Sequence, residues 1–296
     1  MNAELVGEPG RLDAVVARLA AAPRADVQRA IAEGRVLVDG RPRPKSHRLQ
    51  GGERIEADLS GPGPLEPEAG GVDVRYEDGH LLVLSKPAAV VVHPSGAVRS
   101  GTLVNRLLGA GIRLSSGSEP DRPGIVHRLD AGTSGLMVVA KDDAAHAALR
   151  ALFASHGADR RYLALVRGAI EEETFGIDAP LARRAGRTVV DPVGGAEART
   201  EVRVLERHHR ATLVEARPRT GRTHQIRVHL ASIGHPVLGD RAYGGAGEDA
   251  RALGLDRPFL HSATLAFDHP VTGERIELHE PLPGDLSRAL KRSRLT

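Results

Sequence analysis

The chain has 296 residues, 41% of them hydrophobic and 27% charged, which predicts a sizeable core with a solvated surface and excludes disorder along the whole length. It has no cysteine, which excludes disulfides and cysteine-ligated metals, and it lacks both a signal pattern and any apolar run near the ~18 residues of a membrane span, so we expect a cytoplasmic protein with no membrane partner. Its 41 Lys and Arg residues exceed its 38 Asp and Glu residues by only +3, so attraction to nucleic acid depends on where the charges lie.

Two short helices and a hairpin are predicted in residues 1–59. Arg11–Leu19 and Ala25–Glu33 carry apolar residues at helical spacing. Arg35–Gly40 alternates into an Asp-Gly turn, which is typical of a hairpin, and Arg54–Leu59 can supply the returning strand. The next residues, 60–71, are rich in proline and glycine and predict a linker. We therefore expect a small domain at 1–59 and a larger one at 72–296.

Basic side chains are concentrated in the small domain. Between Arg24 and Arg48 there are seven basic and three acidic residues, a local excess of +4. A solvated basic face and a phosphate-binding surface account for this pattern equally well. The seven basic residues are Arg24, Arg29, Arg35, Arg41, Arg43, Lys45 and Arg48.

The larger domain mixes short strands with helices. One helix is predicted over Asp143–Ser155, with an apolar stripe and an aspartate cap. Strands and helices do not alternate regularly, which favours an α+β domain with a mainly antiparallel sheet over a doubly wound one. The predicted strands are Leu81–Leu84, Ala89–Val92, Ile125–Leu129, Leu136–Ala140, Tyr162–Val166, Thr200–Leu205 and Thr212–Ala216.

Asp130 is the first candidate for chemistry. It follows a predicted strand and precedes a polar, glycine-containing turn, where surrounding backbone can fix a carboxylate against a reacting atom. The alternative, favoured by the residues alone, is that Asp130 only accepts hydrogen bonds from turn amides. Ser134 is not a hydrolase nucleophile, because Leu136 stands where the nucleophile elbow requires glycine.

A further helix is predicted with Thr223 as its N-cap. His224 and His229 are five residues apart and point in different directions on a helix, so they do not chelate a metal together. Arg222 and Arg227 fit anion contacts near the helix start, with structural salt bridges as the alternative.

Tyr162 lies on a predicted strand and is one of three tyrosines in a chain without tryptophan. A lone tyrosine on a strand usually belongs to the core. Here it is also one of the few groups able to stack on a base.

These segments together resemble two known modules. Gly10–Leu59, with Arg11-Leu12-Asp13 and Gly34–Arg41, looks like the S4-type RNA-binding domain. Most of the chain closely resembles the RluA/RluD family of RNA pseudouridine synthases. The motifs that carry the second resemblance are Lys86-Pro87, His127-Arg128-Leu129-Asp130, Thr133-Ser134-Gly135-Leu136, Tyr162 with Ala164 and Val166, Gly221–His229, Gly239-Asp240 and Tyr243-Gly244.

The resemblance implies isomerisation of uridine to pseudouridine in structured RNA, without cofactor or metal. The C1′–N1 bond breaks, the detached uracil rotates, and C5 bonds to C1′. In this family the residue matching Asp130 is the essential catalytic group; the sequence leaves open whether it attacks the sugar, attacks the uracil or removes the C2′ proton. The matches imply that Tyr162 packs on the flipped base, that Arg227 keeps Asp130 ionised, and that Arg128 fills the space left by the uridine.

An S4-type domain on this scaffold looks most like the RluD branch, so the expected partner is large-subunit (23S) ribosomal RNA. Arg222, His224 and the seven basic residues of the small domain are the expected RNA contacts. Two alternatives stay open: the same chemistry on transfer RNA or several RNAs, and a ribosome-assembly factor that binds rRNA with dispensable catalysis. A monomer is expected.

Overall fold

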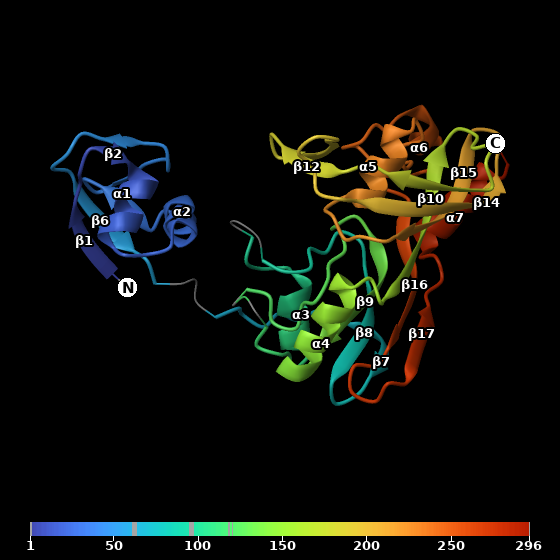
Figure 1. Cartoon of the computed structure of the whole chain (residues 1–296), viewed down its shortest axis with the longest axis horizontal. Helices are drawn as coiled ribbons and strands as arrows, with labels where there is room; N and C mark the ends of the chain where they lie inside the picture. The colour runs from blue at the N-terminus through green and yellow to red at the C-terminus, as the bar shows by residue number, and fades with distance from the viewer. Residues whose placement is uncertain (1, 61–63, 95–97, 118, 120, 296) are drawn as a thin grey trace. The chain divides into compact units, whose positions relative to one another are not determined.

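The computed structural model describes residues 2–60, 64–94, 98–117, 119 and 121–295, and the chain forms two compact units. The first consists of residues 1–66 with 94–100, and the second of residues 67–93 with 101–296. Each has its own sheet and helices (Figure 1). None of the helices in the described part of the chain has the length and hydrophobicity that a membrane crossing requires.

The first unit packs two helices on a four-stranded sheet of order β1-β6-β3-β4, with a separate pair β2–β5. β1 pairs with β6 over five residues, and no sequence pattern had indicated it. The elements are β1 (Asn2–Val6), β2 (Gly10–Arg11), α1 (Leu12–Leu19), α2 (Arg24–Ala32), β3 (Val36–Val38), β4 (Arg41–Pro42), β5 (Arg48–Leu49) and β6 (Arg54–Asp58).

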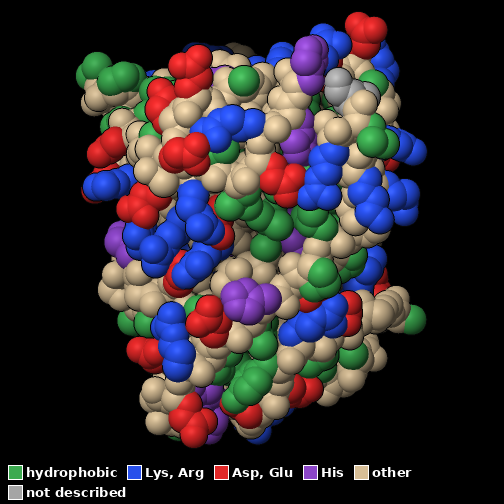
Figure 2. All heavy atoms as spheres, turned by 90° about the vertical axis from the view of Figure 1, so that its right-hand side faces the viewer, with side chains coloured by type: hydrophobic (Ala, Val, Ile, Leu, Met, Phe, Trp, Pro, Cys, Tyr) green, Lys and Arg blue, Asp and Glu red, His purple; other side chains and the backbone are tan. Residues whose placement is uncertain are grey.

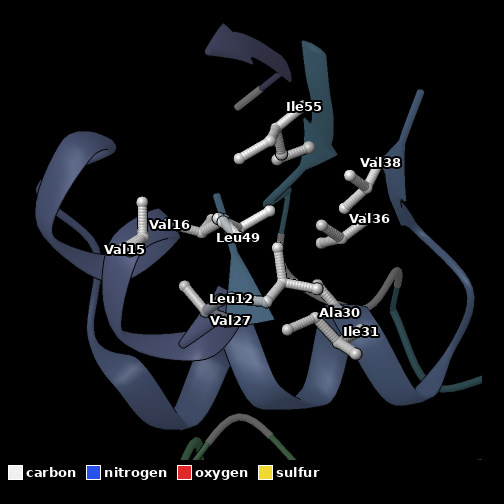
Figure 3. Packing of buried hydrophobic residues seen from close by; sticks show 11 residues of the cluster. Leu12, Val15, Val16, Val27, Ala30, Ile31, Val36, Val38, Leu49 and Ile55 are labelled. Carbon is white, nitrogen blue, oxygen red and sulfur yellow. The ribbon is translucent and has the colours of Figure 1, made fainter. Parts of the chain in front are cut away.

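The core of this unit lies between the helices and the sheet (Figure 3). Leu12, Val16 and Val27 from the helices are fully buried, as are Val36 and Ile55 from the sheet. Full burial of each such side chain stabilises the fold by about 1.5–3 kcal/mol. The apolar residues whose spacing predicted the two helices are therefore also the residues that form the core.

The predicted hairpin forms with a different return strand. Asp39 and Gly40 have φ of 49° and 71°, as a tight turn requires, and the chain returns as β4 beside β3. β6 pairs with β3 as well, on the other side of that strand from β4. β4 is short because Pro42 and Pro44 have no N–H for a strand ladder.

A buried carboxylate joins the two helices of the first unit. Asp13 is 0% exposed and accepts hydrogen bonds from Arg11, Arg24 and Gln28, at 2.7 Å from the Gln28 amide. Burial alone would raise the pKa of Asp13, but these hydrogen bonds outweigh it and lower the pKa to about 2.

The second unit contains a nine-stranded sheet of order β11-β14-β15-β10-β16-β9-β8-β7, with β17 also paired to β16. Among the described residues its only parallel pair is β16–β9; the other pairs are antiparallel. The strands of the sheet are β7 (Asp73–Glu77), β8 (Leu81–Lys86), β9 (Ser134–Ala140), β10 (Asp159–Arg167), β11 (Thr174–Asp178), β14 (Arg199–Arg207), β15 (Ala211–Pro218), β16 (Leu260–Asp268) and β17 (Arg275–His279), and a separate pair consists of β12 (Leu181–Arg184) and β13 (Arg187–Val190). The helices are α3 (Leu103–Gly109), α4 (Asp143–Ala154), α5 (Gln225–Ser232), α6 (Glu248–Ala252) and α7 (Gly284–Ser293).

The parallel contact lies at the start of β9, next to the turn that contains Asp130. Gly135 has φ 110°, and a Cβ there would lie 2.2 Å from the carbonyl oxygen of Ser262 on β16. Only glycine permits this close approach. β12 and β13 form a separate hairpin at the edge of the unit (Figure 1).

Two predicted strands are wrong. Ala89–Val92 is irregular because Ala89 adopts φ 65° after Pro87. Ile125–Leu129 makes a single bridge, from Ile125 to Val139. Beyond it, the side chain of His127 accepts the N–H of Val138 at 3.0 Å, which takes the donor that a backbone ladder would use.

The predicted linker at 60–71 includes residues 61–63, which lie outside the described part of the chain. Its second half contacts the larger unit: Glu68 donates its N–H to Asn105 at 2.9 Å and accepts the N–H of Gly101 at 2.8 Å.

Asp13→Asn should destabilise the first unit by about 2 kcal/mol, because it removes a buried charge that three donors hold. The lowered pKa of Asp13 means that its contribution is full above pH 3.8 and is lost as the pH falls through about 2. Hydrogen exchange of the α1 and α2 amides in the full chain measures the change.

Asp26→Asn is the matched control, because Asp26 forms a 3.5 Å pair with Arg29 between largely exposed side chains. Such pairs are worth ~0–1 kcal/mol. Equal losses of protection in the two variants would contradict a special role of Asp13.

Candidate active site

The second unit contains a cleft of about 650 Å³, which is lined by all three residues predicted to be catalytic and by three of those predicted to contact RNA. Three come from the segment before β9 and from β10: Arg128, Asp130 and Tyr162. The other three, Arg222, His224 and Arg227, come from the segment between β15 and α5 and from α5 itself. Residues about 100 positions apart in the sequence thus meet around one carboxylate.

The centre of the cleft is an ion pair between Asp130 and Arg227. Arg227 Nη1 donates to Asp130 Oδ2 at 2.9 Å. The other side of the same guanidinium donates two hydrogen bonds to Asp240, from Nε at 2.6 Å and from Nη2 at 2.9 Å. Asp240 is 0% exposed, whereas Asp130 keeps an 18% exposed side chain. Arg227 therefore holds Asp130 at a surface that a substrate can reach.

Charge pairing outweighs burial at Arg227. Burial opposes its positive charge, but the hydrogen bonds and charges of Asp240 and Asp130 raise the pKa of Arg227 above its usual value. The guanidinium is therefore permanently charged, and its geometry is fixed by a carboxylate that substrate does not contact.

His224 lies beside this pair, with Nε2 3.9 Å from Asp130 Oδ2. Burial lowers the pKa of His224, and the attraction of Asp130 opposes this only in part. The imidazole is therefore neutral at pH 7. Its Nδ1 lies 2.8 Å from the hydroxyl of Tyr243.

The helix boundary predicted at Thr223 is wrong. α5 begins at Gln225, and His224 before it has φ 57°, in the left-handed region. No side chain caps α5; the side chain of Gln225 instead closes the turn before the helix, because it accepts the N–H of Arg222 at 3.0 Å and the hydroxyl of Thr220 at 2.6 Å. This turn aims His224 into the cleft.

Tyr162 is 6% exposed on β10, and burial raises the pKa of its phenol. Arg128 is exposed and has no hydrogen-bond or ion-pair partner within the described ranges. Arg222 is also exposed and donates Nε to the carbonyl of Glu197 at 3.0 Å. The cleft thus combines a buried ring, a paired carboxylate and three exposed arginines, the third being Arg150.

Lys86 supports the segment behind Asp130. It is 0% exposed, and its Nζ donates to the carbonyls of Pro87 at 2.8 Å, Val90 at 2.9 Å and Ala131 at 3.3 Å. Burial lowers the pKa of Lys86 to about 7, although the charge of Asp130 favours the ammonium form.

Sequence reasoning did not assign Asp240, Lys86 or Arg160 to the site. Arg160 is 9% exposed, lines the cleft and donates Nη2 to the carbonyls of Pro218 and Thr220, so it fixes the start of the segment leading to His224. The available signal was that Lys86 and Asp240 stand in motifs of the resembled family. In the described part of the chain no group of three or more His, Asp or Glu is arranged to hold a metal.

The seven basic residues predicted in the first unit differ in their partners. Arg24 bonds to Asp13, Arg29 pairs with Asp26, and Arg35 bonds to Glu33 and to the carbonyls of Asp58 and Ser60. The remaining four are exposed: Arg41, Arg43, Lys45 and Arg48. Of these, Lys45 donates Nζ to the Gln28 amide oxygen at 3.4 Å.

Two family models match the chain. The RNA pseudouridylate synthase model matches residues 80–232, and the S4 domain model matches residues 10–55. The chain therefore belongs to the family of RNA pseudouridine synthases. Within that family it carries an S4 domain before the synthase domain, which confirms both resemblances and the α+β fold class.

Relatives match over nearly the whole chain. An uncharacterized RNA pseudouridine synthase of Mycobacterium bovis is 39% identical over 95% of this chain and 93% of that protein. The ribosomal large subunit pseudouridine synthase D of Vibrio vulnificus is 40% identical over 93% and 88%, and that of Zymomonas mobilis is 43% identical over 80% and 77%. The solved structure of human RNA pseudouridylate synthase domain containing 1 matches with TM-score 0.57 and 29% identity, over 76% of this chain and 87% of that one.

The lowered pKa of Lys86 predicts a pH-dependent stability. Unfolding restores an ordinary lysine that takes up a proton between pH 7 and 10.5, so the free energy of unfolding should rise with pH across that window. The rise from pH 7 to 9 is about 2 kcal/mol. Lys86→Met should lack this component. Urea unfolding of both proteins at pH 7 and 9 measures it, and parallel pH dependences would contradict the burial effect.

Proposed function

We propose that the protein converts uridines of large-subunit (23S) ribosomal RNA to pseudouridine, with Asp130 as the catalytic group. The observation that carries this proposal is the Asp130–Arg227 pair, 2.9 Å long, at the accessible surface of a cleft in a chain of this family. Asp240 occupies the other side of the guanidinium, so Arg227 can orient Asp130 without being free to move.

The other cleft residues fit the remaining parts of the reaction. Tyr162 packs on the flipped uracil from the buried side of the cleft, where a base excludes water from the ring. Arg222 lies at the rim and contacts the RNA backbone, and Arg128 takes the place of the flipped nucleotide. His224 contributes a neutral donor next to Asp130.

The ribosomal substrate is supported by the relatives. Proteins named ribosomal large subunit pseudouridine synthase D are 40–43% identical to this chain over most of their length. The S4 domain supplies exposed basic residues of the kind that bind structured RNA through phosphates.

Asp130→Asn should abolish pseudouridine formation and leave RNA affinity within a few fold, because it removes the reacting carboxylate and no phosphate contact. Tritium release from 5-³H-uridine-labelled 23S rRNA, small-subunit rRNA and bulk transfer RNA measures the reaction. Release only from transfer RNA would keep the chemistry and overturn the substrate.

Asp268→Asn is the matched control, because Asp268 is an exposed acid on β16 that pairs with Arg275 outside the cleft. It should retain wild-type release. No release by the wild type from any RNA that it binds would overturn the proposed activity.

Arg48→Gln should weaken RNA binding. The plot of the logarithm of the association constant against the logarithm of salt concentration should become less steep by about one, as expected for one lost phosphate contact. Arg54→Gln removes the same charge from β6 of the same unit, where Arg54 pairs with Glu4 and Glu56. It should leave the slope unchanged. Filter binding between low and physiological salt compares the two variants, and identical slopes would contradict a phosphate contact at Arg48.

A further inference from the structure

Tyr243 contacts both groups that flank Asp130, although it does not line the cleft itself. Its hydroxyl lies 2.8 Å from His224 Nδ1, and the two rings meet edge to face with centroids 5.6 Å apart. The guanidinium of Arg227 lies over the Tyr243 ring, 5.1 Å from its centroid. One buried side chain, 8% exposed, therefore touches both His224 and Arg227.

The loop that contains Tyr243 is fixed by the carboxylate that holds Arg227. Asp240 Oδ1 accepts the N–H groups of Ala242 at 2.9 Å and Tyr243 at 3.3 Å, in addition to its hydrogen bond from Arg227. Because Asp240 is fully buried, a shift of this loop would have to break charge-assisted hydrogen bonds to Arg227.

The hairpin β12–β13 also contacts Tyr243 and its loop. Arg187 of β13 lies over the same ring, 4.8 Å from its centroid, and donates to the carbonyl of Ala242. The ring also belongs to a small apolar cluster with Leu181 and Val190 from the hairpin and Val228 from α5. Tyr243 thus joins the hairpin to the helix that carries Arg227.

The hydroxyl of Tyr243 forms a hydrogen bond with His224 in addition to the packing of the ring. When it donates to Nδ1 of the neutral His224, the ring proton sits on Nε2, which faces Asp130 Oδ2 at 3.9 Å. His224 also has φ 57°, a left-handed conformation that is unfavourable for a non-glycine residue and persists only where its surroundings fix it. The phenol is the hydrogen-bond partner that fixes this imidazole.

We propose that Tyr243 is a positioning residue through which the hairpin β12–β13 sets the orientation of Arg227 and the tautomer of His224 beside Asp130. This inference rests on the proposed function for its effect on rate. Its effect on His224 is independent of turnover.

The first test is Tyr243→Phe in the full chain, which keeps the ring and removes the hydroxyl. Long-range ¹H–¹⁵N spectra of histidine-labelled protein report the tautomer of His224, assigned by its loss in His224→Gln. The wild type should show the single Nε2–H form and Tyr243→Phe a mixture of tautomers. An unchanged His224 signal in the variant would overturn the proposal even if the wild type proved inactive on every RNA.

The second test compares Arg187→Gln with Arg183→Gln under single-turnover conditions at saturating 23S rRNA. Both arginines are exposed on the same hairpin, but only Arg187 contacts Tyr243. Arg187→Gln should lower the rate constant roughly tenfold, as displacement of positioned groups does, with RNA affinity within twofold of the wild type. Arg183→Gln should retain the wild-type rate. Equal rates in the two variants would overturn the coupling, and because both variants keep Tyr243, this test does not depend on the folding of Tyr243→Phe.

Discussion

The active-site half of the molecule depends on one buried cation between two carboxylates. Arg227 donates Nε and Nη2 to Asp240 and Nη1 to Asp130. Breaking such a buried pair from one side typically costs about 3–5 kcal/mol, because it leaves an uncompensated charge. The arrangement therefore fixes the position of α5, the loop after Asp240 and the turn before β9 relative to one another. The group with two carboxylates and one guanidinium carries a net charge of −1, and the accessible part of that charge is at Asp130.

Several polar side chains around the cleft hold backbone groups in place. Lys86 holds the carbonyl after Asp130, and Arg160 holds two carbonyls of the segment that leads to His224. Gln225 closes the turn before α5 with its side chain. The contacts of Lys86 and Arg160 join a side chain to backbone that is 45 to 60 residues away in the sequence. Such contacts orient the reacting groups before substrate arrives and lower the reorganisation that the reaction requires.

Sequence reasoning succeeded where the physical signal is local. The helices α1, α2 and α4 follow apolar spacing, and the Asp39-Gly40 turn follows from residues that tolerate positive φ. It failed, for example, at two places. The side chain of His127 accepts the N–H of Val138 in place of a backbone partner, and the strand predicted there is a loop. α5 begins at Gln225, after His224 in the left-handed region, so Thr223 is not its cap. The residues themselves singled out Asp130, Tyr162, Arg222 and Arg227 as candidates, and the roles that motif resemblance gave to the six cleft residues stay predictions. The roles of Asp240 and Tyr243 could be inferred only from their three-dimensional contacts with Arg227.

The distribution of charge explains how a chain with a net charge of only +3 can serve an RNA substrate. On the face shown in Figure 2, basic and acidic side chains lie interspersed, so that face offers no continuous positive surface. Inside the cleft Arg227 is neutralised by its carboxylates, and Arg160 is tied to carbonyls. Of the arginines that line the cleft, Arg128, Arg150 and Arg222 are exposed. Phosphate affinity grows with the number of contacts, so basic residues outside the cleft would add to what these three supply. In the S4 unit, Arg41, Arg43, Lys45 and Arg48 are exposed, and we predict that they supply further phosphate contacts.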